Sequence, residues 1–257
     1  MPANLTLSAG TLYAFLLVLA RVGSALVFVP LPGVKGAPEP VRVAFALGFT
    51  LALAARWPVV DASNVTAVRM LAWVAAEAGF GIAIGLVVAI VLEALTLAAQ
   101  VLGLQAGYAY ASTIDPNTDA DSGILLVVAQ LVSGLLFFSL GFDREMLRVF
   151  AQSLERVPSG GYAPGPVSAE TLIRLGSGLF AVGVRLAMPV VALLVMVDVA
   201  LALLGRLNAQ LQLIQLAFPA KMLTALLILS WVAALFPRIL MEFGGHAWGA
   251  ARELMGR

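Results

Sequence analysis

The sequence predicts an all-α, membrane-associated protein whose helices are kinked or broken. Of its 257 residues, 61% are hydrophobic and only 11% are charged, and the mean hydropathy is +1.01. A water-soluble domain of this size needs far more polar surface. Apolar runs recur along the chain, and proline, glycine or charged residues separate them. These observations place the chain in or against a membrane.

Six apolar stretches are expected to form the helices. They cover approximately residues 12–30, 41–55, 70–102, 123–141, 172–204 and 213–236. A hydrocarbon core of about 30 Å needs about 20 helical residues. The stretch 123–141 fits this length and 41–55 is short, whereas 70–102 and 172–204 are too long. The lengths therefore do not fit a simple row of spanning helices.

The start of the chain and two proline-marked segments refine this picture. The first charged residue is Arg21, so the amino terminus lacks the basic region of a cleaved signal peptide, and the first run is expected to stay in the mature protein. The segment "VPLPGVKGAPEPVR" is expected to be an extended connector, with a helix restarting near Val41. A second break is expected in "GRLNAQLQLIQLAFPAKM", whose amides at 208–212 would be costly to expose to lipid.

Charged residues lie inside or at the edges of the apolar runs. They are Arg21, Arg42, Glu77, Glu93, Arg185, Asp198 and Lys221. One charge at the centre of a lipid-facing helix costs about 2.5–3.5 kcal/mol on insertion scales. Interhelical salt bridges or positions at an interface would avoid this cost, and a proton or ion pathway is the alternative. Loop charges are mixed in sign, so the positive-inside rule gives no orientation.

Small residues recur on one helix face in "EAGFGIAIGLVVAIVLEA". Glu77, Gly81 and Gly85 follow one another every four residues, which lets another helix backbone approach closely. The face can serve packing inside the chain or contact with another subunit. The residues expected to pack helices or to contact subunits are Glu77, Gly81, Gly85, Arg185, Asp198 and Lys221.

The sequence offers no catalytic constellation. The chain has no cysteine and a single histidine, His246, which alone cannot build a zinc site or a typical triad. HExxH and GxxxxGK motifs are absent from the sequence. A net charge of +1 gives no electrostatic reason to expect a nucleic-acid partner. We therefore expect no enzymatic activity, cofactor or metal.

An ordered set of segments resembles the FliR/SctT family of type III secretion export-gate proteins. The segments are "ARVGSALVFVPLPG", "PEPVRVAFALGFTLAL", "EAGFGIAIGLV", "GLQAGYAYASTIDPNTDADSG", "LLFFSLGFDREMLRVFAQSLERVP", "NAQLQLIQLAFPAKMLTALLIL" and "LFPRI". Together they span essentially the whole chain. The element "TIDPNTDADSG" is more similar to flagellar members of the family than to injectisome members.

This resemblance implies a single export-gate subunit over residues 1–257. The implied fold is a FliP-like unit at 1–171 fused to a FliQ-like helical hairpin at 172–236, followed by a C-terminal segment at 237–257. The implied function is to form, with FliP and FliQ, the channel through which unfolded flagellar proteins cross the bacterial inner membrane. FlhB and FlhA are the further implied partners, and the implied location is the flagellar basal body.

The acidic, glycine-containing segment 106–122 acquires a role from the same resemblance. In the family the corresponding loop reaches into the central pore and helps to seal the closed channel. The residues implied for this plug are Ala106, Gly107, Tyr108, Ala109, Tyr110, Ala111, Ser112, Thr113, Ile114, Asp115 and Pro116. Without the family, the segment can equally be read as a polar surface turn whose acids cap a helix beginning near Ser122.

Three alternatives remain open from the sequence. One is the injectisome gate subunit SctT. Another is a secondary transporter, in which Glu93 or Asp198 would be a proton or ion site, although we find no internal repeat relating the two halves of the chain. The third is a structural scaffold that never lines the export path.

Overall fold

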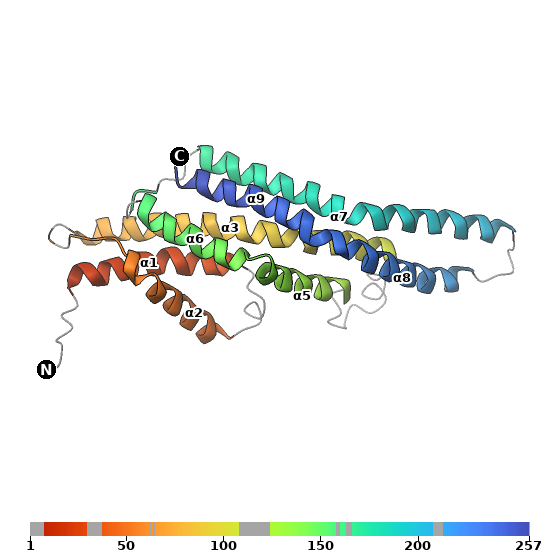
Figure 1. Ribbon diagram of the computed structural model, residues 1–257, viewed down its shortest axis with the longest axis horizontal. Coiled ribbons are helices and arrows are strands. Elements are labelled where there is room, and N and C mark those ends of the chain that lie inside the picture. Colours follow the sequence, from red (N-terminus) through yellow and green to blue (C-terminus); the bar gives the residue numbers. More distant parts are fainter. Residues whose placement is uncertain are drawn as a thin grey trace. The chain divides into compact units, whose positions relative to one another are not determined.

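The computed structural model describes residues 8–29, 38–61, 63, 65–107, 124–157, 160–162, 166–207 and 213–256. Every regular element in these ranges is a helix, which confirms the all-α prediction (Figure 1). The α-helices are α1 (Ala9–Phe28), α2 (Glu39–Ala52), α3 (Ala67–Ala106), α5 (Ile124–Ser139), α6 (Phe142–Arg156), α7 (Pro166–Leu207), α8 (Leu213–Val232) and α9 (Phe236–Leu254). Short 3₁₀ turns lie at η1 (Ala54–Arg56) and η3 (Ala233–Leu235).

Four helical segments in the described ranges are long and apolar enough to cross a membrane. They are Ala9–Phe28, Ala67–Ala106, Ser168–Arg206 and Pro219–Leu254, and the pair α5 and α6 adds a fifth if it is counted as one broken span. The last three are 40, 39 and 36 residues long, whereas a bilayer needs about 20. The expectation of overlong and broken helices is therefore confirmed.

Helices α2 and α8 begin close to the two breaks that the sequence predicts. α2 begins at Glu39, close to the predicted restart near Val41, and residues 30–37 lie outside the described ranges. α7 ends at Leu207 and α8 begins at Leu213, and residues 208–212 of the predicted second break lie outside the described ranges. Pro219 lies inside α8, where it removes one amide donor without ending the helix.

The chain divides into two compact units. Unit 1 comprises residues 1–90, 141–176 and 244–257, and unit 2 comprises 91–140 and 177–243. Three helices, α3, α7 and α9, contribute residues to both units.

Unit 1 is organised around aromatic and aliphatic contacts between short and long helices. α1 packs against α2, and α6 packs against η1. The ring of Phe49 on α2 meets Phe150 of α6 with 5.5 Å between centroids. Phe15 on α1 and Trp57 after η1 are 5.6 Å apart. These contacts fix α2 and α6 within the unit because aromatic pairs bury large apolar surfaces with specific geometry.

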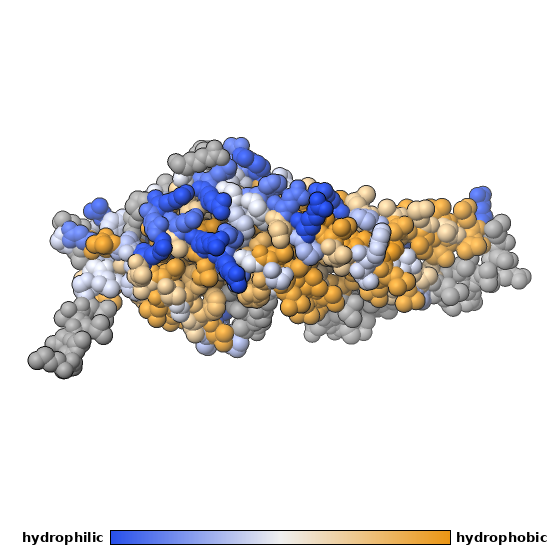
Figure 2. All heavy atoms as spheres, in the orientation of Figure 1, coloured by the Kyte–Doolittle hydropathy of each residue, from blue (hydrophilic) through white to orange (hydrophobic). Residues whose placement is uncertain are grey.

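The amphipathic helix α6 supplies part of the polar surface of unit 1. Its buried residues are Phe142, Met146, Val149, Phe150, Ser153 and Leu154, which follow the helical period. Hydrophilic side chains gather on the visible surface over α6 (Figure 2). The helices α6 and α9 were not among the six predicted stretches, because their apolar residues are periodic rather than continuous. The exposed polar face of α6 suits water or a polar partner rather than lipid.

Unit 2 has a continuous apolar core contributed by α3, α5, α7, α8 and α9. Core residues include Leu95, Leu102, Leu125, Leu186, Val190, Leu194, Ala225 and Leu240. Its outer surface is apolar as well, and hydrophobic side chains dominate the visible surface over α5 and α8 (Figure 2). On α8, Leu227 and Trp231 are 73% and 80% exposed. Such a surface requires lipid or another protein to cover it.

Glycine makes the break between α5 and α6 possible. The last α5 turn closes with the bond from the Leu140 amide to the Leu136 carbonyl. Gly141 then adopts a φ of 72°, and its carbonyl accepts bonds from the amides of Arg144 and Glu145, which start α6. A residue with a Cβ is strained in this left-handed conformation.

We predict that Gly141→Ala lowers stability by about 1 kcal/mol, because alanine pays for the left-handed backbone while gaining no contact. The thermal midpoint of the purified protein in detergent measures this. Gly245→Ala is the matched control, since Gly245 lies in α9 with nothing within 4 Å of the added Cβ, and alanine favours a helix there. Equal shifts for the two variants would contradict the role of the break.

Candidate functional site

The predicted pore loop lies almost wholly outside the described residues. Ala106 is the last residue of α3 and is buried. Gly107 follows with a φ of 85°, and its amide bonds to the Leu104 carbonyl at 3.3 Å, so α3 ends in a glycine turn. The remaining predicted plug residues, Tyr108, Ala109, Tyr110, Ala111, Ser112, Thr113, Ile114, Asp115 and Pro116, are not among those described. Their role remains a prediction.

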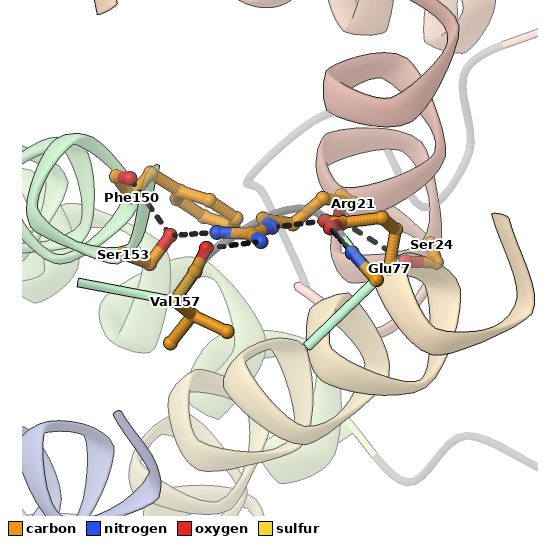
Figure 3. Close-up of polar contacts among 7 residues, drawn as sticks. Arg21, Ser24, Glu77, Phe150, Ser153 and Val157 are labelled. Atoms are coloured by element: carbon orange, nitrogen blue, oxygen red, sulfur yellow. Dashed lines mark hydrogen bonds and ion pairs between the residues drawn. The ribbon is translucent and has the colours of Figure 1, made fainter. Parts of the chain in front are cut away.

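A buried ion pair joins α1 to α3 in unit 1. The Nε of Arg21 donates to the Oε2 of Glu77 at 2.5 Å, and the two side chains are only 1% and 3% exposed (Figure 3). Both charges lie in helices that are long and apolar enough to cross a membrane. Each therefore supplies the counter-charge that makes burial of the other tolerable.

Further hydrogen bonds complete this Arg21–Glu77 centre. The Nη1 of Arg21 donates to the Ser153 hydroxyl at 3.1 Å, and Nη2 donates to the Val157 carbonyl at 3.2 Å. The Oε1 of Glu77 accepts the Gly160 amide at 3.0 Å. All three guanidinium nitrogens and both carboxylate oxygens are thus bonded (Figure 3). The centre ties α1, α3, α6 and the chain just after α6 together.

Gly81 and Gly85 continue the same face of α3 and lie against α1. A Cβ added at Gly81 would sit 2.0 Å from the Arg21 carbonyl oxygen. One added at Gly85 would sit 2.5 Å from the Ala25 carbonyl oxygen. These positions exclude any side chain, because the obstructing atoms are backbone. Within unit 1, the Glu77, Gly81 and Gly85 face is where α1 and α3 approach each other.

A second charged centre lies in unit 2. The Nζ of Lys221 on α8 contacts the Oδ1 and Oδ2 of Asp198 on α7 at 2.9 and 3.0 Å. Gln105 near the end of α3 donates to the same Oδ2 at 3.2 Å. The Lys221 and Asp198 side chains are 16% and 42% exposed. This centre joins three helices of the unit and neutralises two charges within apolar segments.

Arg185 and Glu93 are placed differently. Arg185 is exposed on α7, and Glu93 is half-buried on α3. Neither takes part in an ion pair with another described residue. Of the residues predicted to pack helices or contact subunits, Arg185 is the one that the structure leaves on the surface of its unit without a charge partner in the described ranges.

The described residues present no arrangement suited to catalysis. His246 is exposed on α9, and the described ranges contain no group of three His, Cys, Asp or Glu side chains that could hold a metal ion. Unit 2 contains a partly open cavity of about 280 Å³. Its lining is apolar apart from Ser230, so it lacks the convergent polar groups that orient a substrate.

Comparison with known proteins identifies the family. The family described as bacterial export proteins, family 1, matches residues 12–245. The chain belongs to this family. Residues 12–245 include parts of both units and both charged centres, so membership concerns the whole architecture rather than one segment.

Relatives in this export family carry a common name. The Escherichia coli K12 protein named flagellar biosynthetic protein FliR is 28% identical over 229 residues, which cover 88% of this chain and 84% of the relative. The protein of the same name from Pectobacterium carotovorum is 25% identical over 95% of this chain and 90% of the relative. That from Aquifex aeolicus is 24% identical over 85% of this chain and 84% of the relative. The resemblance found in the sequence is confirmed, and the family is one of export proteins rather than enzymes.

Sequence reasoning missed several partners in the two centres. Ser153, Val157 and Gly160 complete the Arg21–Glu77 centre, and Gln105 joins Asp198 and Lys221. Ser153 carried a usable signal, since it lies at a buried position of the amphipathic α6. Val157 and Gly160 contribute backbone atoms, which no residue type reveals.

We predict that Glu77→Gln destabilises the protein by about 3–5 kcal/mol, because it leaves the Arg21 guanidinium buried beside a neutral amide. The amount of protein in the membrane fraction and its thermal midpoint measure this. Glu155→Gln is the control, because Glu155 pairs with Arg56 through side chains that are 57% and 49% exposed, and exposed pairs contribute about 0–1 kcal/mol. Similar losses in both variants would contradict a special role for the buried centre.

We predict that Gly81→Ala forces α1 and α3 apart and lowers stability by about 1–3 kcal/mol, the usual effect of overpacking. Gly79→Ala, on the same helix, is the matched control, because its nearest contact would be the Tyr162 ring at 4.0 Å. The thermal midpoints of the two variants, measured in parallel, show whether the added Cβ at Gly81 lowers stability. The interpretation fails if Gly81→Ala is as stable as Gly79→Ala.

Proposed function

We propose that this protein is a subunit of the flagellar type III protein export gate in the bacterial inner membrane. In this proposal it forms, with FliP and FliQ homologues, the channel through which unfolded flagellar proteins cross the membrane. FlhB and FlhA homologues are its further partners, and the flagellar basal body is its location. The observation that carries the proposal is the family match over residues 12–245, joined to relatives named for flagellar biosynthesis.

The physical properties of the chain support assembly into a larger complex. Three of its apolar helical segments are much longer than a bilayer requires, and large hydrophobic side chains are exposed in unit 2. A monomer in lipid would leave part of such a helix in water. Neighbouring subunits would cover the surplus length.

The flagellar system is favoured over the injectisome by the names of the relatives described above. A secondary transporter is less favoured, because Lys221 already neutralises the Asp198 carboxylate, which also accepts a hydrogen bond from Gln105. The division into a FliP-like part at 1–171, a FliQ-like hairpin at 172–236 and a C-terminal segment at 237–257 belongs to the same proposal. Helices α7 and α8 provide two long apolar helices in the hairpin range.

The test of the proposal is removal of the gene from its native host. We expect loss of swimming and of flagellar subunit secretion, with both restored by the gene in trans. Wild-type tagged protein should co-purify with FliP and FliQ homologues in a complex resolved by native mass spectrometry. Normal secretion of flagellar subunits in the deletion strain would overturn the proposal.

We further propose that loop 106–122 helps to seal the closed pore. Its two tyrosines supply bulk among small residues, and Pro116 prevents a helix from filling the segment. The glycine turn at Gly107 ends α3 where the loop begins.

We predict that deletion of residues 106–122 makes the assembled gate leak, because the pore loses the side chains that obstruct it. Membrane conductance, or entry of a small dye, in cells expressing the variant with its partners measures the leak. Substitution of both Tyr108 and Tyr110 by alanine tests the bulky residues without shortening the chain and should give a smaller leak. Wild-type conductance in an assembled deletion variant would rule out the sealing role.

A further inference from the structure

Arg185 points away from the core of unit 2. Two positions earlier, Gly183 lies against α3, where an added Cβ would be 2.8 Å from the Cδ2 of Leu97. Successive helical residues are about 100° apart, so Arg185 lies on nearly the opposite side of α7. The neighbouring residues Leu186, Ala187 and Val190 are buried, whereas Arg185 is exposed.

The surface around Arg185 is apolar on both sides along the helix. Ala181 and Val184, before it, are exposed. Met188 and Met196, after it, are 52% and 67% exposed. Arg185 is thus a single cation within an exposed apolar stripe of α7. The other charge in this part of α7, Asp198, already has Lys221 and Gln105 as partners.

Neither lipid nor water suits the whole stripe. Hydrocarbon around Arg185 would leave a guanidinium without counter-charge in a medium that penalises it strongly. Placing Arg185 at the membrane edge would put either Ala181 and Val184, or Met188 and Met196, into water, because the apolar surface continues in both directions. A protein helix that is apolar along its length and carries one carboxylate satisfies both requirements.

We propose that Arg185 pairs with an Asp or Glu carboxylate on an apolar helix of a neighbouring subunit, which packs along this stripe of α7. This inference rests on the proposed function in a multi-subunit gate and specifies the chemistry of one contact in it. Ala181 and Ala192 lie one turn before and two turns after Arg185 and are exposed, which leaves room for the second helix to approach closely.

The first test locates the partner without altering Arg185. A photo-crosslinking amino acid at Ala181 or Met188 is activated in cells that assemble the complete gate, and the products are mapped by mass spectrometry. We expect both positions to crosslink to one apolar segment of another polypeptide that contains Asp or Glu within one turn of the linked residue. Crosslinks to phospholipid alone, to a second copy of this chain, or to a segment without an acid would overturn the proposal.

The second test removes the charge of Arg185 and measures whether recovery of the complex falls or rises. If a partner carboxylate faces Arg185, Arg185→Leu leaves that carboxylate buried and unpaired, so recovery of the complex should fall at least tenfold. Arg185→Lys keeps the charge and should retain more complex than Arg185→Leu. If lipid covers the stripe, leucine is the better residue, and an unchanged or increased recovery of complex would overturn the proposal.

A third test exchanges the charges of Arg185 and its partner acid, to show whether the two side chains pair directly. Arg185→Glu should abolish assembly, and replacement of the crosslinked acid by Arg should restore it, whereas no restoration would contradict a direct pair. Failure of the proposed function is distinguishable, because the wild-type chain would then not co-purify with FliP and FliQ homologues at all. A wild-type complex whose recovery is indifferent to Arg185 would refute only the contact described here.

Discussion

Burial of ionic groups within apolar helices is the constraint around which unit 1 is built. The Arg21 guanidinium has an exposed fraction of 1%, and its position is viable only because Glu77, Ser153 and Val157 occupy its donors. Those partners come from α3, from α6 and from the residue that ends α6. The bonds are directional, so they also fix how these helices are rotated about their own axes. Apolar packing alone tolerates small rotations that a centre of four hydrogen bonds does not.

The two charged centres share a design but differ in exposure. The Arg21–Glu77 centre is sealed, with both side chains almost fully buried. In the centre of unit 2, Lys221 is mostly buried while Asp198 keeps 42% of its side chain exposed. A carboxylate that remains accessible can accept another donor from outside the chain, whereas burial separates Glu77 from such donors. Unit 1 therefore uses charge to hold itself together, and unit 2 retains charge at its surface.

The sequence predicted the fold class and the charged positions because both depend on composition and local pattern. Continuous apolar runs identified α1, α2, α3, α5, α7 and α8, whereas α6 and α9 were missed because charged residues interrupt their apolar ones. The spacing of Glu77, Gly81 and Gly85 indicated a packing face, but the identity of its partner, α1, depends on tertiary structure. The sequence also could not predict that Asp198 pairs with Lys221, because several other basic residues in apolar segments could have supplied its counter-charge. Backbone partners such as the Gly160 amide leave no trace in residue type.

The separation of paired charges along the chain bears on how the protein is made. Asp198 and Lys221 are 23 residues apart, and Arg21 and Glu77 are 56 residues apart. At a synthesis rate of about 5–20 residues per second, the first member of each pair is synthesised roughly 1–10 seconds before its counter-ion. During that interval an isolated charge on a hydrophobic segment opposes partition into the bilayer. Insertion of each leading helix is consequently more favourable once the helix that carries its counter-charge has also been made.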